Sequence, residues 1–330
     1  MSLYSASETL CIVWTYFCQL IRRSGRMFYA LAKIMVPIMA LVQVAQWLGW
    51  IEALGQAFGP VMGLLNLPAG AGIVWIASVL VGLYGAIAAL IGLSATLDMT
   101  TGQFSALASM ILFAHSLPVE QAIVRRAGAS FWATTGLRLG AAVIYGGAVS
   151  WLSHWSGWLT EPMSFQWLQG SQDVIDPADY TLWQWLHATA FSLLLTYAVI
   201  LALLVLLDVM KRIGLTALIT RALTPVLRWV GLDASVAPVT MVGTLLGLSY
   251  GGALIIEEAE RLQLSARTRF LALSWLSLSH SLIEDTALVM ALGADGWVVL
   301  GGRVVLTLLV VGALARLWRA DTGMPQPRPA

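Results

Sequence analysis

Two short stretches decide the fold of this chain: residues 113–120 read Phe-Ala-His-Ser-Leu-Pro-Val-Glu, and residues 278–285 read Leu-Ser-His-Ser-Leu-Ile-Glu-Asp. They lie 165 residues apart, which is half of the 330-residue length. At this offset the sequence matches itself without a gap, with 19 identities in the 72 positions that align 57–128 with 222–293. The shared residues include His, Pro and Gly, and beyond this window Arg138 matches Arg303 at the same offset; such residues are rare or costly inside membrane helices. The pattern predicts an internal duplication.

The composition is that of a membrane protein. Hydrophobic residues make up 59% of the chain and charged residues 11%, with a mean hydropathy of +0.81, whereas a soluble domain carries about 25% charged residues. The net charge of +1 gives no reason to expect a nucleic-acid partner. No P-loop motif for an ATPase or GTPase occurs. We expect a polytopic all-α membrane protein that contacts the lipid bilayer, binds no nucleic acid and needs no cofactor; the sequence is also compatible with a homo-oligomer.

The same series of apolar segments occurs in each half. It comprises a crossing helix, an amphipathic segment, a long apolar helix, two short limbs and a final helix. In the first half these are 28–49, 51–66, 69–93, 103–114 with 118–127, and 129–152; in the second they are 193–214, 216–231, 234–257, 269–279 with 283–292, and 296–318. We divide the chain into an N-terminal amphipathic or interfacial helix (1–26), a first repeat (27–152), a Trp-rich acidic linker (153–188), a second repeat (189–318) and a tail (319–330).

The two short limbs of each half decide its orientation. At 1.5 Å per residue, each limb is about half as long as the roughly 30 Å hydrocarbon core. The limbs therefore join into one broken crossing helix or fold back as a re-entrant hairpin. A hairpin gives three crossings per half and inverts the second copy, whereas a broken crossing helix gives four and leaves the copies parallel.

The positions of Lys and Arg favour the re-entrant hairpin, because these residues accumulate on the cytoplasmic side. The linker 153–188 contains neither, and three crossings per half put it outside while the basic clusters lie inside. These clusters are Arg22, Arg23, Arg26, Arg125, Arg126, Lys211, Arg212, Arg221, Arg228, Arg316, Arg319 and Arg328. One violation is the loop 257–269, whose Arg261, Arg267 and Arg269 fall outside.

We therefore predict two inverted-topology repeats in the bacterial inner membrane, with both termini cytoplasmic. Each repeat has about three transmembrane helices, an interfacial helix and a re-entrant helical hairpin. The His-Ser-Leu tips then meet near the middle of the bilayer, where irregular backbone persists only if protein buries it or if it lines a cavity. Inverted repeats with broken helices at this depth are typical of secondary transporters.

Ionisable residues at such depth are costly and are functional candidates. The candidate substrate-binding residues are His115, Ser116, Glu120, Arg138, His280, Ser281, Glu284, Asp285 and Arg303. The candidate metal ligands among them are His115, Glu120, His280 and Asp285.

Purely structural interpretations of these residues remain open. Ser281 and Glu284 fit a capping box at a helix start. Arg138 and Arg303 fit structural partners that neutralise the buried acids. Close helix packing would explain the glycines Gly82, Gly85, Gly247, Gly251 and Gly252.

The chain resembles the Gate-domain, or nucleoside recognition, membrane proteins. The resemblance rests on the two His-Ser-Leu stretches and on the glycine-rich segments 81–85 (Val-Gly-Leu-Tyr-Gly) and 246–252 (Leu-Gly-Leu-Ser-Tyr-Gly-Gly), and it covers roughly 40–150 and 205–315. That family is related to the membrane units of concentrative nucleoside transporters and of ferrous iron transporter B. The resemblance implies a helical unit with re-entrant hairpins and a transport role. This chain lacks the iron transporter's GTPase domain and is shorter than a typical nucleoside transporter, so the substrate stays open.

We expect a secondary-type transporter, proton- or cation-coupled and not an enzyme, that moves a small polar solute, with a nucleoside-like solute favoured. The alternative substrate is a divalent metal ion, because two His and several carboxylates suit Fe²⁺, Mn²⁺ or Zn²⁺. A further alternative is a membrane enzyme or a partner subunit that acts on a lipid-linked substrate.

Overall fold

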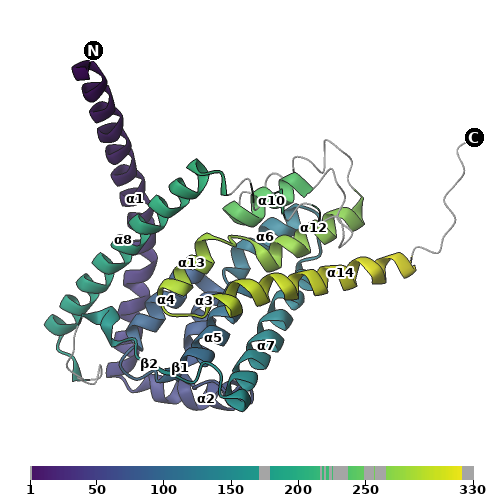
Figure 1. The fold of residues 1–330 in the computed structure, drawn as a ribbon. Coiled ribbons are helices and arrows are strands. Elements are labelled where there is room, and N and C mark those ends of the chain that lie inside the picture. Colours follow the sequence, from purple (N-terminus) through teal and green to yellow (C-terminus); the bar gives the residue numbers. More distant parts are fainter. Residues whose placement is uncertain are drawn as a thin grey trace, which may run out of the picture.

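The chain is built almost entirely of helices in the computed structural model (Figure 1). The structure describes residues 2–170, 179–215, 237–248 and 265–321, with the single residues 218, 221, 222, 225 and 256. The helices are α1 (Ser2–Trp47), α2 (Trp50–Leu64), α3 (Gly70–Val81), α4 (Leu83–Gly92), α5 (Thr101–Phe113), α6 (Leu117–Arg126), α7 (Phe131–Ser156), α8 (Leu182–Arg212), α10 (Ala237–Leu246), α12 (Ala266–Ser279), α13 (Glu284–Ala291) and α14 (Arg303–Asp321), with the short helices η1 (Gln166–Gln169) and η3 (Trp297–Gly302). The two-residue strands β1 (Met99–Thr100) and β2 (Pro162–Met163) pair antiparallel.

Four stretches of the described residues are long and apolar enough to cross a membrane. They are Trp14–Trp47, Thr101–Arg126, Leu182–Met210 and Trp297–Trp318. The predicted class, an all-α membrane protein, is therefore confirmed at this level. Part of the predicted linker (171–178), most of the predicted segments 216–231 and 234–257, the residues 257–264 and most of the tail lie outside the described residues.

The N-terminal region does not form the separate surface helix expected over 1–26, because α1 continues without a break to Trp47. The basic residues at 22–26, which suggested a boundary, lie inside α1. One of them, Arg23, forms an ion pair with α8, because its Nη1 lies 3.2 Å from Asp208 Oδ1. At the other end of α1, the indole Nε1 of Trp47 donates to Tyr180 O just before α8, at 3.1 Å. Helices α1 and α8 therefore pack antiparallel (Figure 1).

The segment 69–93 is not the single crossing helix that its hydropathy predicts. Gly82 separates α3 from α4 with φ 117° and ψ −176°, a conformation that favours glycine. Helix α4 then returns along α3. In a continuous helix, residues 77 and 85 would lie about 12 Å apart along the axis. A Cβ placed on Gly85 would instead lie 3.2 Å from the carbonyl oxygen of Ala77, so the chain folds back between them.

Both ends of the α3–α4 pair lie at the same end of the molecule. The amide Nε2 of Gln46, near the end of α1, donates to Gly92 O at the end of α4, at 2.9 Å. At the start of α3, a Cβ on Gly70 would lie 2.9 Å from a methyl group of Leu97, which follows α4. The pair is therefore a helical hairpin with Gly82 at its tip.

Helices α5 and α6 do not form the expected hairpin. Helix α7 runs antiparallel along both: Thr134 near its start donates to Gln121 of α6 at 2.7 Å, and Ser153 near its end packs against Gly102 of α5. Helix α6 therefore leads onward from α5, as Figure 1 shows. The difference from the predicted hairpin has a local cause. The break at 114–116 bends the path without reversing it, whereas the α3–α4 chain reverses at a single glycine.

The second half contains a broken helix that runs the opposite way. The residue Asp295, just after α13, donates its backbone N–H to Ser105 Oγ near the start of α5, at 2.8 Å. The start of α12 lies at the far end of α6, where a Cβ on Gly128 would lie 2.9 Å from Arg269 Nη1. The paths α5–α6 and α12–α13 are thus antiparallel. Helix α5 at their crossing is buried nearly all round, with Phe104, Leu107 and Phe113 at most 2% exposed.

Candidate functional site

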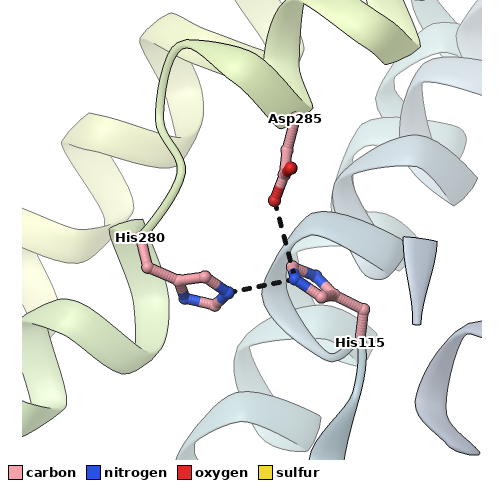
Figure 2. Close-up of side chains that lie close together, drawn as sticks. All are labelled: His115, His280 and Asp285. Atoms are coloured by element: carbon pink, nitrogen blue, oxygen red, sulfur yellow. Dashed lines mark hydrogen bonds and ion pairs between the residues drawn. The ribbon is translucent and has the colours of Figure 1, made fainter. Parts of the chain in front are cut away.

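The breaks of the two antiparallel helices meet at a pair of histidines. His115 follows α5 and His280 follows α12, and their Nε2 atoms lie 3.0 Å apart (Figure 2). The two side chains occupy equivalent positions, 165 residues apart in the sequence. Both residues are buried, at 5% and 1% exposure. The structure therefore brings together the two histidines that the repeated sequence singled out.

The hydrogen bonds of the two rings determine what the facing nitrogens carry. His115 Nδ1 lies 3.0 Å from Ile111 O, and His280 Nδ1 lies 2.8 Å from Leu276 O. A carbonyl oxygen only accepts, so each Nδ1 donates its proton, and a neutral imidazole then has a bare Nε2. Two bare lone pairs 3.0 Å apart repel each other. This arrangement is stable when the two Nε2 atoms share a proton or a metal cation.

Two carboxylates lie around the histidine pair. Glu120 Oε1 is 3.2 Å from His280 Nε2 and 3.6 Å from His115 Nε2. Asp285 Oδ2 is 3.6 Å from His115 Nε2 (Figure 2). Neighbouring ligands of a transition metal ion at 2.0–2.1 Å are about 3.0–3.4 Å apart. The two imidazole nitrogens and an Asp285 oxygen lie within 4.8 Å of one another, and Glu120 Oε1 lies within 3.6 Å of both nitrogens, so small shifts would bring these groups to the separations of ligands around one ion.

Arg138 of α7 stabilises the first break and orients Glu120. It is fully buried. Its Nε donates to Phe113 O at 2.7 Å and its Nη2 to His115 O at 2.8 Å, which satisfies carbonyls that a helix end leaves without partners. Its Nη1 donates to Glu120 Oε2 at 2.6 Å. The expected Arg138–Glu120 pair is thus present, and it leaves Oε1 facing the histidines.

Arg303, at the start of α14, holds the second break in the same way. Its Nε donates to Leu278 O at 2.8 Å and its Nη2 to His280 O at 3.0 Å. It also donates to Leu112 O of the other half at 3.0 Å. The expected pair with Asp285 is not formed: Nη1 has no hydrogen-bond partner among the described residues. Asp285 is one methylene shorter than Glu120 and faces His115 instead.

The two serines lie at the breaks with their side chains against the opposing glycines. Ser116 has φ 49° and Ser281 has φ 48°, and each hydroxyl packs on the Cα of Gly82 or Gly247 respectively. Gly247 has φ 100° and matches Gly82 at the repeat offset. Each half therefore packs a glycine break against the serine that follows its histidine, which agrees with the expected close packing at Gly82 and Gly247.

The predicted capping box at Ser281 is not formed. Helix α13 begins at Glu284, and the residue before it, Ile283, makes no side-chain cap. Glu284 is half-buried in the first turn, next to the carboxylate of Asp285 that reaches His115. The carbonyl oxygens of Ile111 and Leu276, which accept from the two Nδ1 atoms, were not among the predicted site groups. Their position four residues before each histidine was the available signal, since a helix places such residues together.

Comparison with known proteins places the chain beside one membrane protein. The uncharacterized membrane protein YvoD of Bacillus subtilis (strain 168) is 25% identical over 291 residues, which cover 88% of this chain and 91% of that protein. No family model matches the chain, and no solved structure matches it. The likeness agrees with the apolar helices in indicating a membrane protein.

Proposed function

We propose that the chain consists of two inverted repeats, each with three crossings. The crossings are α1, the broken helix α5–α6 and α7 in the first half, and α8, the broken helix α12–α13 and α14 in the second. The re-entrant element of the first half is the α3–α4 hairpin, with α2 at the interface. The antiparallel course of the two broken helices supports this arrangement.

The charge distribution supports the revised path. On this path Arg267 and Arg269, at the start of α12, lie on the side of the other basic clusters. Arg267 Nη2 donates to Ala315 O near the chain's basic C-terminal end, at 3.1 Å, and Arg269 lies beside Gly128, two residues after Arg126. The positive-inside rule then gives both termini a cytoplasmic position, in a bacterial inner membrane.

We propose that the protein is a secondary transporter of a divalent first-row transition metal ion, which binds between the two helix breaks. One observation carries the proposal: the Nε2 atoms of His115 and His280, whose Nδ1 atoms face backbone carbonyls, lie 3.0 Å apart beside two carboxylates. Imidazole combined with carboxylate suits Fe²⁺, Mn²⁺ and Zn²⁺, and two His with one carboxylate is a common Fe²⁺ set. His115, His280, Glu120 and Asp285 are the proposed ligands.

The same spacing argues against the nucleoside-like solute that the sequence favoured. A separation of 3.0 Å leaves room for a proton or a metal ion but not for a purine or pyrimidine ring. Because a nitrogen–nitrogen separation of 3.0 Å also suits a hydrogen bond, a proton fits the same position and is the proposed coupling ion. The proposal assigns no catalytic residue.

The surrounding backbone supports a transport role over static binding. Among the described residues, four positions with positive φ lie close to the histidine pair: Ser116 and Ser281 directly follow the histidines, and Gly82 and Gly247 contact the hydroxyls of these serines. Discontinuous helices around a central site are a recurring feature of transporters that alternate their access. The proposed relationship to the Gate-domain proteins, some of whose relatives move nucleosides or ferrous iron, is consistent with this role.

The test uses the four histidines of the chain, of which two are central and two peripheral. Purified protein is titrated with Fe²⁺ without oxygen, and with Mn²⁺ and Zn²⁺, by calorimetry, and uptake is measured in proteoliposomes. His115→Ala with His280→Ala is expected to abolish binding and uptake. His154→Ala with His187→Ala, at two exposed positions, is the matched control and is expected to leave both unchanged.

Two outcomes would contradict the proposal. The first is wild-type protein that binds none of the three ions. The second is uptake of a nucleoside, measured in the same vesicles, that the central double variant abolishes while metal binding stays intact. Binding that requires the central pair but not the peripheral pair supports the metal site.

A further inference from the structure

The two halves of the site are not equivalent in one respect. Each arginine donates Nε and Nη2 to matching carbonyls, but only Arg138 uses Nη1, which binds Glu120 Oε2 at 2.6 Å. Nη1 of Arg303 has no hydrogen-bond partner among the described residues, although Arg303 is fully buried. A buried cationic donor without a partner is costly, so this asymmetry calls for a functional explanation.

The matching carbonyl bonds indicate where the unpaired donor points. Arg303 binds Leu278 O and His280 O as Arg138 binds the equivalent carbonyls of the first half. Nη1 of Arg303 therefore faces the position that a glutamate carboxylate would occupy at position 285. The residue there is Asp285, whose shorter side chain turns its Oδ2 to 3.6 Å from His115 Nε2. One carboxylate thus lies between two positive positions, the ion site and the guanidinium.

We propose that Asp285 is a mobile ligand, which exchanges between the cation at the histidine pair and Nη1 of Arg303, whereas Arg138 holds Glu120 as a fixed ligand. This inference rests on the proposed function. When the ion leaves, Asp285 pairs with Arg303, so no buried charge is left uncompensated. The exchange gives the ion a route to leave a buried site, which transport requires as much as binding.

Arg303 also connects the exchange to the other half. Its Nη2 donates to Leu112 O in the last turn of α5, at 3.0 Å. A carboxylate that arrives at Nη1 changes the position of the same guanidinium, and with it the bond to α5. The loss of the ion at the break around His280 therefore also changes the contact with α5 just before the break at His115.

The test lengthens the mobile ligand and shortens the fixed one. Co²⁺, whose optical spectrum reports coordination, is loaded onto purified wild-type, Asp285→Glu and Glu120→Asp proteins, and its release to a chelator is followed by stopped flow. A glutamate at 285 reaches Nη1 with one oxygen and the ion with the other, as Glu120 does. Release is expected to slow about tenfold or more, the effect of one charge-assisted hydrogen bond, while Glu120→Asp is expected to release faster.

Release from Asp285→Glu within about twofold of the wild-type rate would overturn the inference alone, because Co²⁺ would still bind. Wild-type protein that binds no Co²⁺ would overturn the proposed function as well. If Asp285→Glu does not fold, Arg303→Lys replaces it, because it keeps the charge but removes the forked donor. Slower release from this variant supports the exchange, whereas an unchanged or faster rate refutes it.

Discussion

The clearest energetic prediction concerns Arg138, whose guanidinium makes three hydrogen bonds at 2.6–2.8 Å. We expect Arg138→Met to lower the free energy of unfolding by about 3–5 kcal/mol, because it leaves Glu120 buried without its cation. Glu120 is only 11% exposed in its side chain, so water compensates little. The matched control is Arg303→Met, compared with the metal ion bound, a state in which Asp285 faces the histidines; there the variant removes three carbonyl bonds but no carboxylate pair, and we expect it to cost about 2 kcal/mol less.

Unfolding in mixed micelles of a mild detergent and sodium dodecyl sulfate, followed by tryptophan fluorescence, measures both variants. Adding Glu120→Gln to Arg138→Met removes the unpaired charge, so the double variant is expected to regain part of the lost stability. A loss below about 1 kcal/mol for Arg138→Met, or equal losses for the two arginine variants, would refute the ion-pair reasoning.

Two further predictions concern the glycine tip and the path of the chain. Gly82→Ala is expected to destabilise the protein by about 1–3 kcal/mol, because alanine disfavours the positive φ at this position. Gly136→Ala, in α7 with open space around an added Cβ, is the control and is expected to be neutral or stabilising. Thermal unfolding compares the two variants, and equal effects would argue against a strained backbone at Gly82. Asp98→Cys, in a background without native cysteines, is expected to react with an impermeant maleimide from outside intact cells, and Arg126→Cys only after permeabilisation. Labelling of both from the same side would refute the broken crossing at His115.

The helices themselves were largely predictable from the sequence. The limb expected over 103–114 is α5 (Thr101–Phe113), and the limb expected over 118–127 is α6 (Leu117–Arg126). Hydropathy locates such segments because burial and lipid both select apolar residues. The histidine pair was predictable for a different reason, since polar residues repeated at one offset in an apolar chain have few structural explanations.

The direction of the chain after each break was not predictable from the sequence. The segment 69–93 is continuously apolar, and nothing in its composition distinguishes a straight helix from a hairpin. The reversal depends on the backbone at Gly82 and on the packing of Gly85 against Ala77, which requires knowledge of both helices. The partners of Arg303 were equally hidden, because one of them, Leu112, lies 191 residues away.

The proposed inversion of the two repeats does not depend on which element of each half is the re-entrant hairpin and which is the crossing helix. Inversion requires an odd number of crossings per half, and either order of one hairpin and one crossing gives the same number. Only the loop between these two elements changes sides. In the first half that loop carries Asp98 and no Lys or Arg, so its charge is compatible with the outer side. In the second half Arg267 and Arg269 follow that loop at the start of α12, and the proposed path puts both on the inner side with the other basic clusters.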